Sequence, residues 1–344
     1  MKCFKYVFII LVIFIKTGNV LSNENIFNVN NIEVIKKGNL TNQQLTNLAI
    51  KRGFKELAQK IFLEKDFKKL SQLNFSQIKG LVKYYQVDTD TDERKINYNI
   101  FFDKDKLHKL FYDRGILYSE IFNKELYTLP IFKDEDEYYI YSKNFFYDRW
   151  NDISNNDLIE FILPLENIEV IQKINANKND LLGLNFNSLF TEYSSKNLAL
   201  ILIEDRGLKE EKIFLKTRIV GKEINKNILV KRENLDKNQF YEKIISEIKK
   251  ELETLVKSQN LIDVRTPSFL NTKFLITKQN NLIELNKRLK NIGLIENIFV
   301  QEFNNEYVYL KIKYLGKLDK MINQLKNQKI ILKLINDQWS LKII

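Results

Sequence analysis

The chain begins with one short apolar block, and this block limits what the rest can fold into. Lysines precede the run Tyr6–Ile15, which holds ten uncharged apolar residues, and a polar segment ending at Ser22 follows it. As a helix this run rises about 15 Å, roughly half the hydrocarbon thickness of a bilayer, so it is too short to span a membrane. The layout is typical of a secretory signal peptide. We therefore expect cleavage of residues 1–22 between Ser22 and Asn23, and a periplasmic mature chain without a transmembrane segment.

The cysteine content removes several kinds of chemistry from the mature chain. The only cysteine, Cys3, lies inside the predicted signal peptide. The exported part therefore has no disulfide, no thiolate nucleophile and no cysteine-ligated zinc, and burial of apolar side chains must hold it together. Hydrophobic residues make up 44% of the sequence. With about 320 mature residues, this is enough for two or three separate cores.

The chain is basic, with a formal net charge of +11 that falls to +8 without Lys2, Lys5 and Lys16 of the signal peptide. A basic balance is the first sign of nucleic-acid binding. Here lysines and acids are interspersed, as in Lys209–Lys212, and arginine is scarce. We therefore interpret the lysines as solvated surface and predict no nucleic-acid partner. Peripheral contact with anionic lipid or a wall polymer is the alternative that the charge leaves open.

The hydrophobic pattern predicts small modules of sheet and helix. Near the N-terminus, residues 23–36 alternate as a strand, and Thr41 with Gln44 three residues later marks a helix start. A strand pair and a helix that ends at Gly115 follow, which completes the order β-α-β-β-α.

The middle of the chain has its own strands and one long helix. Leu198–Ile203 is an unbroken apolar run suited to a strand buried on both faces, and a hairpin turns at Gly221. Asp236 then caps a helix whose apolar residues recur every three or four positions up to Val256. A helix with one apolar stripe must lie against a sheet.

After Pro267 the pattern has the ferredoxin-like order β-α-β-β-α-β with one additional C-terminal strand. The sequence therefore predicts an α/β (α+β) fold of tandem sheet-plus-helix modules, the last of them ferredoxin-like. We place an N-terminal domain with an aromatic segment at residues 23–151, a middle domain at 152–266 and the C-terminal domain at 267–344.

Two groups of side chains are candidates for ligand binding. Several aromatic residues gather at the end of the first domain, and their rings can stack on a sugar or peptide or, as is commoner, cover the open end of a core. A pair of acids follows the apolar strand, where ligands often bind in α/β sheets, although a polar turn explains the pair equally well. The candidate residues are Tyr139, Tyr141, Trp150, Glu204 and Asp205.

Other reactive patterns are weak. His108 is the only histidine, and we expect it on the polar, lysine-lined side of a short helix, where no partner would hold its ring for catalysis. The alternating acids Asp88, Asp90 and Asp92 lack the glycine and glutamate of a calcium loop, and no glycine-rich phosphate loop occurs. We therefore predict no catalytic residue, no metal and no cofactor.

Several short motifs occur in an order that resembles a known family. They are Phe102–Asp103, Leu129–Pro130, Trp150, Phe161–Leu165 and Tyr314–Gly316. In this order they resemble the bacterial exported family called domain of unknown function 2066, over nearly the whole mature chain. The resemblance carries no catalytic residue to this sequence. The small α/β units are also similar in fold to periplasmic assembly proteins of flagellar rings and of wall-synthase activators.

These observations favour a non-enzymatic periplasmic protein, an adaptor or assembly factor that docks on a cell-envelope complex through protein partners. Exposed sheet edges in tandem modules can accept a strand from such a partner. The alternative is a glycan- or peptidoglycan-binding module or hydrolase that uses the Tyr138–Trp150 aromatics and carboxylates such as Glu204 and Asp205. In that case Trp150→Ala should abolish ligand binding without unfolding the protein.

Overall fold

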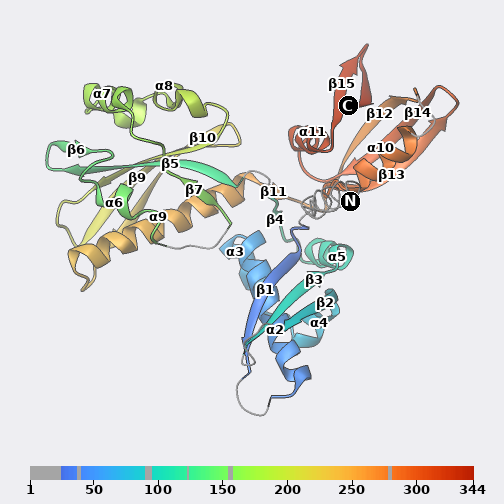
Figure 1. Cartoon of the computed structure of the whole chain (residues 1–344), viewed down its shortest axis with the longest axis horizontal. Coiled ribbons are helices and arrows are strands. Elements are labelled where there is room, and N and C mark those ends of the chain that lie inside the picture. Colours follow the sequence, from blue (N-terminus) through green and yellow to red (C-terminus); the bar gives the residue numbers. More distant parts are fainter. Residues whose placement is uncertain (1–24, 37–39, 90–94, 122–123, 154–157, 278–280) are drawn as a thin grey trace, which may run out of the picture. The chain divides into compact units, whose positions relative to one another are not determined.

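The computed structural model describes residues 25–36, 40–89, 95–121, 124–153, 158–277 and 281–344 (Figure 1). The predicted signal peptide with its cleavage point between Ser22 and Asn23 lies outside the described residues, and so do Asp90 and Asp92. The chain divides into two compact units. Unit 1 holds the residues up to Gln59, Lys65–Leu117 and Ile262–Ile344, and unit 2 holds Lys60–Glu64 and Tyr118–Leu261. The α/β modules predicted from the sequence pattern are confirmed.

The N-terminal module of unit 1 is a three-stranded antiparallel sheet with helices. Its elements are β1 (Asn28–Ile35), α2 (Asn42–Ile61), α3 (Glu64–Leu70), α4 (Phe75–Gly80), β2 (Val82–Thr89), β3 (Lys95–Phe102) and α5 (Lys104–Arg114). The strand order is β1-β3-β2, so the third strand lies in the middle. The predicted helix start is present before α2, where the backbone amides of Thr41 and Gln44 each donate to the other residue's side chain.

The C-terminal module of unit 1 has the predicted element order. Its elements are β12 (Ser268–Leu275), α10 (Asn281–Lys290), β13 (Ile295–Phe303), β14 (Tyr307–Tyr314), α11 (Leu318–Asn327), β15 (Ile330–Ile335) and β16 (Gln338–Ile343). They form one five-stranded sheet in the order β13-β14-β12-β16-β15. The additional strand β16 pairs with β12 in parallel and with β15 in antiparallel, which moves β15 to the sheet edge.

Unit 2 is built on a mixed sheet in the order β10-β9-β8-β5-β6, with β7 paired to β5. Its elements are β5 (Glu125–Asp134), β6 (Glu137–Tyr139), α6 (Phe145–Arg149), β7 (Glu160–Ile162), α7 (Ile168–Ala176), η1 (Leu181–Gly183), α8 (Phe186–Leu189), η2 (Thr191–Tyr193), β8 (Asn197–Glu204), β9 (Glu210–Ile219), β10 (Lys222–Lys231) and α9 (Lys237–Gln259). The short strands β4 (Tyr118–Ser119) and β11 (Leu261–Ile262) form a separate ladder.

Both faces of the unit 2 sheet are covered, which makes a three-layer arrangement. On one face, α9 and α6 pack on a core that includes Ile201 and Ile203 of β8. On the other face, α7 and α8 pack on Leu198 and Leu200 of the same strand. Successive strand side chains point to opposite faces, so an unbroken apolar run is what a strand buried on both sides needs. The prediction for Leu198–Ile203 is confirmed.

The predicted domain boundary at residues 151–152 is wrong. Strand β5 pairs in parallel with the whole length of β8, from Leu126 opposite Asn197 to Lys133 opposite Glu204. The aromatic segment that follows β5 therefore belongs to unit 2 and not to the N-terminal module. The pattern missed this because parallel strands join through long connections that leave no local signal. The predicted boundary at 266–267 lies close to Ile262, where the division between units falls.

Candidate functional site

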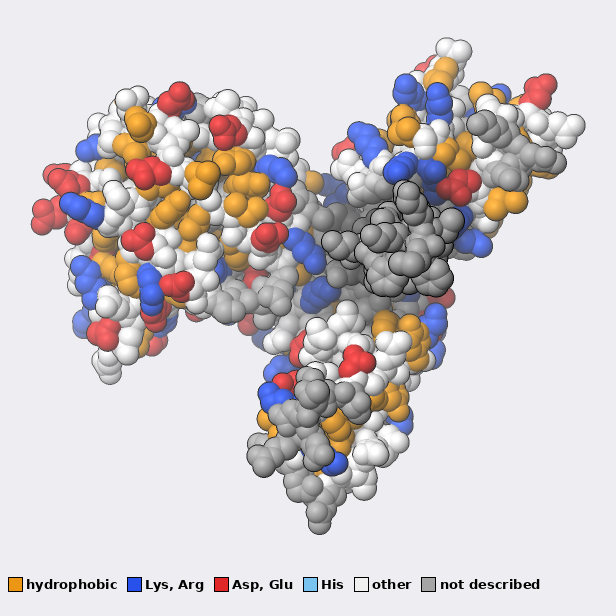
Figure 2. Space-filling model, in the orientation of Figure 1, with side chains coloured by type: hydrophobic (Ala, Val, Ile, Leu, Met, Phe, Trp, Pro, Cys, Tyr) orange, Lys and Arg blue, Asp and Glu red, His pale blue; other side chains and the backbone are white. Residues whose placement is uncertain are grey.

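A cavity of about 450 Å³ lies on the α7 and α8 side of unit 2. Its lining comes from β5, from the chain after β6, and from the segment between β7 and η2. Figure 2 shows hydrophobic side chains, in orange, gathered on the displayed face of unit 2 with acidic side chains among them. The polar and aromatic side chains that matter for ligand chemistry are Tyr141, Glu166, Glu169, Lys173, Glu192 and Tyr193.

Asn144 shapes the chain around this cavity. Its buried side-chain amide donates to the carbonyl oxygens of Pro130, Tyr139 and Ile140, each at 2.9 Å. Its side-chain oxygen accepts from the backbone amides of Phe146 and Tyr147 in the first turn of α6 and caps that helix. One residue therefore joins β5, the end of β6 and α6, and the chain between them carries Tyr141 into the cavity wall.

Tyr141 is buried, with 4% of its surface exposed, and its ring meets Tyr147 edge to face at 5.3 Å. Within the described residues its hydroxyl forms no hydrogen bond of normal geometry, although the backbone amide of Asn167 lies close enough to favour its ionised form. Burial raises the pKa of Tyr141 to about 12, and Tyr147 adds to the rise, whereas the backbone amide of Asn167 acts in the opposite direction. At neutral pH the hydroxyl is thus an uncharged donor and acceptor that a ligand in the cavity can engage.

The wall around Tyr141 is more acidic than basic. The carboxylate of Glu166 is near enough to both Tyr141 and Tyr147 to raise their pKa values further. Glu169 forms an ion pair with Lys173 at 3.7 Å. Glu192 also lines the cavity and is exposed. The excess of carboxylates over cations in this wall favours a ligand that carries positive charge.

Tyr193 supplies a further aromatic wall. Its ring stacks on Tyr127 with centroids 4.3 Å apart and an interplanar angle of 26°. The hydroxyl of Tyr147 donates to the carbonyl oxygen of Pro164 at 2.8 Å, which attaches α6 to the segment before α7. Aromatic walls beside carboxylates are a common way to hold a cationic group.

The structure separates the other aromatic candidates from Tyr141. Tyr139 does not line the cavity, and its hydroxyl donates to Glu137 at 2.7 Å. Trp150 is 0% exposed in the core beneath α9, with its ring edge to face on Phe161. Trp150 is thus not accessible to a ligand, and we expect any loss of binding in Trp150→Ala to accompany unfolding. The cluster mainly fills the core, which was the commoner interpretation of such rings.

Glu204 lies at the end of β8 and is engaged by neighbouring side chains. It forms ion pairs with Lys133, at 2.6 Å, and with Arg206. Burial pushes the pKa of Glu204 up, but the hydrogen bonds from these two cations outweigh it and the pKa is lowered.

Asp205 is held in the same way in the loop after β8. One of its oxygens accepts from Arg232 at 2.7 Å and from the backbone amide of Gly207 at 2.8 Å. The other oxygen accepts from Tyr241 at 2.8 Å. Burial raises the pKa of Asp205, and these bonds reverse the effect and lower it. Both acids therefore stabilise the loop between β8 and β9, as the polar-turn interpretation expects.

His108 is not on a solvated surface, and that prediction is wrong. The ring is buried, packs edge to face on Phe27 at 5.6 Å, and places Nδ1 3.1 Å from the Glu296 carboxylate. The hydrogen bond to His108 lowers the pKa of Glu296 against the effect of burial. The sequence could not indicate this pair, because 188 residues separate its members.

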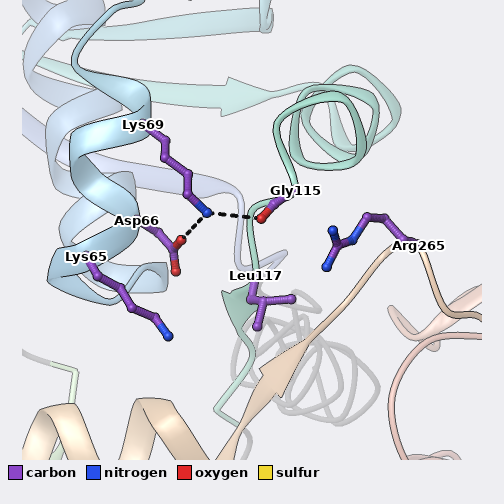
Figure 3. Close-up of a pocket in the computed structure, with 6 residues that line it drawn as sticks. All are labelled: Lys65, Asp66, Lys69, Gly115, Leu117 and Arg265. Carbon is purple, nitrogen blue, oxygen red and sulfur yellow. Dashed lines mark hydrogen bonds and ion pairs between the residues drawn. The ribbon is translucent and has the colours of Figure 1, made fainter.

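A second cavity, of about 230 Å³, lies in unit 1 and has a basic lining (Figure 3). In it, Lys69 reaches the Asp66 carboxylate at 2.9 Å and the carbonyl oxygen of Gly115 at 3.2 Å. Arg265 pairs with Asp263 through two nitrogens, at 2.8 and 2.7 Å. Lys69 and Arg265 thus have internal partners, and we place the candidate ligand site at the larger cavity of unit 2.

Comparison with known proteins adds no family. The chain matches no family model, no curated protein and no solved structure. The resemblance to the exported family therefore stays a prediction. Across the described ranges, no three His, Cys, Asp or Glu side chains cluster in a way that could hold a metal ion. In the same ranges, no helix is both long enough and apolar enough to cross a membrane.

Proposed function

We propose that this chain is an exported, non-enzymatic adaptor of the cell envelope, and that the cavity of unit 2 receives a basic side chain from a segment of a partner protein. The buried hydroxyl of Tyr141 carries the proposal. The Asn167 backbone amide can only donate to this oxygen, so the O–H donor of Tyr141 is left without an acceptor. A buried donor without an acceptor costs free energy, and at a cavity wall it points to a ligand that supplies the missing acceptor or displaces the amide.

The chemistry of the wall selects the kind of ligand. Glu166 and Glu192 supply negative charge, while Tyr141 and Tyr193 supply ring surface and hydroxyl groups. An ammonium or guanidinium group can donate to carboxylates and also lie against aromatic rings. A volume of about 450 Å³ is within the usual range for ligand pockets and admits a lysine or arginine side chain.

The N-terminal module adds a surface suited to docking. Strand β2 is at the edge of its sheet, and Tyr84, Tyr85 and Val87 on it are each close to half exposed. An edge strand with exposed apolar side chains can pair with a strand of another chain. Either feature can bind a partner segment by itself.

The test compares two blocked peptides, acetyl-Ala-Lys-Ala-amide and the same peptide with norleucine in place of lysine, in calorimetric titrations of the mature protein. We expect the lysine peptide to bind at least about tenfold more tightly, the value of one charge-assisted hydrogen bond. Glu166→Gln should weaken its binding by about the same factor. Glu160→Gln changes an exposed carboxylate on β7 outside the cavity and serves as the control.

Equal affinity for the two peptides would contradict a cation site. Unchanged affinity in Glu166→Gln would contradict the location of the cation site in the cavity of unit 2. If Glu160→Gln lost as much affinity for the lysine peptide as Glu166→Gln, binding would depend on the total charge of the protein and not on a site in the cavity.

The same cavity favours one alternative, an envelope glycan-binding module or hydrolase. Aromatic rings and carboxylates from separate segments converge there, as they do in sugar sites. The candidate carboxylates are then Glu166 and Glu192 and not Glu204 and Asp205. If purified protein releases reducing sugar from peptidoglycan fragments and Glu166→Gln abolishes the release, the hydrolase is correct and the adaptor is not.

A further inference from the structure

We propose that the C-terminal module binds the surface of an anionic lipid bilayer through the open face of its sheet. This inference concerns unit 1 and does not depend on the cavity in unit 2. The open face is the side of the sheet opposite to its buried core (Figure 1, orange to red strands).

Alternation along the two central strands defines this face. In β12, Leu270, Thr272 and Phe274 are buried, and the residues between them point the other way. In β14 the buried residues are Val308, Leu310, Ile312 and Tyr314. The cross-strand pairs on the open face are Phe269–Lys313, Asn271–Lys311, Lys273–Tyr309 and Leu275–Tyr307.

The open face carries an excess of lysine. The alternation continues into β16 and β15, which add Lys342, opposite Ile331, and Lys333, opposite Ser340. On the other side, β13 adds Glu302, opposite Tyr309. At the paired positions of this face in the described residues, the charged side chains are Lys273, Lys311, Lys313, Lys333, Lys342 and Glu302. This excess of positive charge attracts anionic lipid head groups.

The same face exposes large apolar side chains. Phe269 and Leu275 are each 52% exposed, and Phe299, opposite Lys311 on β13, is 47% exposed. Aromatic rings, aliphatic groups and lysines together are the composition of membrane–water interfaces, where rings sit among head groups and ammonium groups meet phosphates.

The positions of the lysines favour lipid, and not single-stranded nucleic acid, as the ligand of the open face. Lys273 Nζ lies 4.2 Å from the ring centroid of Tyr307 and 5.5 Å from that of Tyr309. Lys311 Nζ lies 4.7 Å from the ring of Phe269. Binding of single strands uses free ring faces as stacking platforms for bases. Here ammonium groups lie over the rings of Tyr307, Tyr309 and Phe269, so these rings are less suited to base stacking, while the ammonium groups can still meet phosphates.

The experiment is co-sedimentation of the mature protein with vesicles of 30% phosphatidylglycerol and 70% phosphatidylcholine, and with vesicles of phosphatidylcholine alone. We expect binding to the anionic vesicles that weakens as salt rises from 50 to 500 mM, and at least tenfold less binding to the neutral vesicles. Each lysine near an anionic surface contributes a factor of roughly five. The variant Lys273→Gln/Lys311→Gln/Lys313→Gln should therefore lose roughly a hundredfold in partition coefficient.

The matched control removes the same charge from the helices of the same module. Lys287, Lys290 and Lys326 are exposed on α10 and α11, and replacing all three by glutamine should leave binding within a factor of about three. An equal loss in both triple variants would overturn the proposal, and so would equal binding to neutral vesicles. Displacement of protein from vesicles by a 20-nucleotide oligothymidylate at equal phosphate concentration would favour nucleic acid instead. If the first triple variant fails to fold by circular dichroism, Lys311→Gln alone should lose roughly fivefold.

Discussion

Single buried polar residues in unit 2 differ in whether the fold satisfies them. Asp205 is almost enclosed, yet both of its oxygens accept hydrogen bonds from Arg232, Tyr241 and the backbone. Tyr141 is more deeply buried, and in the described structure its hydroxyl makes no hydrogen bond of normal geometry, although the Asn167 backbone amide lies near it. A satisfied acid stabilises a loop, whereas an unsatisfied hydroxyl at a cavity wall is a cost that a ligand can remove. Lack of a hydrogen bond is not sufficient by itself, because the indole nitrogen of Trp150 also lacks one and lies in the core. At the residue scale, Tyr141 is a candidate functional group because its unsatisfied hydroxyl belongs to a residue that lines a cavity.

Removal of the Tyr141 hydroxyl should therefore stabilise the empty protein. For Tyr141→Phe we expect the free energy of unfolding at pH 7 to rise by about 1 kcal/mol, because the burial cost of a hydroxyl without a well-formed hydrogen bond disappears. The ligand-free variant is compared with the wild type by chemical denaturation. A clear loss of stability would mean that the hydroxyl has a partner in the free protein.

The raised pKa of Tyr141 should also make the stability of the protein fall at high pH. The pKa of Tyr141 is about 12 in the folded protein and 10.0 when unperturbed, so between these values the folded state keeps a proton that the unfolded state has released. Stability should fall as pH rises from 10 to 12, and Tyr141→Phe should lose less over that interval. Denaturation of the wild type and of Tyr141→Phe at pH 9, 10 and 11 measures how steeply the stability of each protein falls with pH. Parallel curves would show that Tyr141 titrates normally.

Trp150 belongs to the core, and its replacement should unfold the protein rather than remove ligand binding alone. Trp150→Ala removes a ring that is 0% exposed, which should cost about 3–5 kcal/mol. Tyr139→Ala, at a partly exposed ring outside the cavity, is the matched control and should cost much less. Denaturant midpoints of the two variants give the comparison, and similar values for both would place Trp150 outside the core.

At the scale of elements, helix caps and strand patterns account for most of the local structure. Asp236 and Gln239 form a reciprocal capping box before α9, and Thr41 and Gln44 do the same before α2. These signals lie within four residues of each other, so a sequence pattern can reveal them. The Asn144 cap is different, because its amide also joins β5 and the end of β6, and nothing in the local sequence indicates those contacts.

Asn144→Ala should thus cost more than the loss of an ordinary cap. It leaves two backbone amides of α6 and three carbonyl groups without this partner, and we expect about 3–5 kcal/mol of lost stability. Asp236→Ala removes an exposed cap in the same unit and should cost about 1 kcal/mol. Thermal and denaturant unfolding of both variants tests the difference. Equal costs would mean that the three carbonyl contacts contribute nothing.

At the scale of the whole molecule, sheet pairing decides which segments fold together. The parallel pair of β5 and β8 joins residues on both sides of the expected boundary at 151–152. The strand that completes the C-terminal sheet beside β12 is β16 and not β15. Both arrangements depend on contacts between distant parts of the chain, which periodicity does not contain.

Two fragments of unit 2 should therefore behave differently. The fragment 118–261 keeps the whole sheet from β5 to β10 and α9, and we expect cooperative unfolding from it. The fragment 152–266 lacks β5 and leaves the edge of β8 and one end of both cores open, so it should not fold. Circular dichroism melts of both fragments give the answer, and a cooperative melt of 152–266 alone would restore the sequence-based boundary.

The sequence by itself determined most of the strands, the caps before α2 and α9, the apolar stripe of α9 and the α/β class, but not α6 or α7. These follow from hydrogen bonds and burial periods within a few residues. Only the tertiary structure decided that Tyr141 lines a cavity while Trp150 lies in a core, that Asp205 is held by Arg232, and that His108 meets Glu296. The physical reason is that burial and pairing of these side chains depend on partners far along the chain, whose approach the packing of sheets and helices sets and no local pattern records.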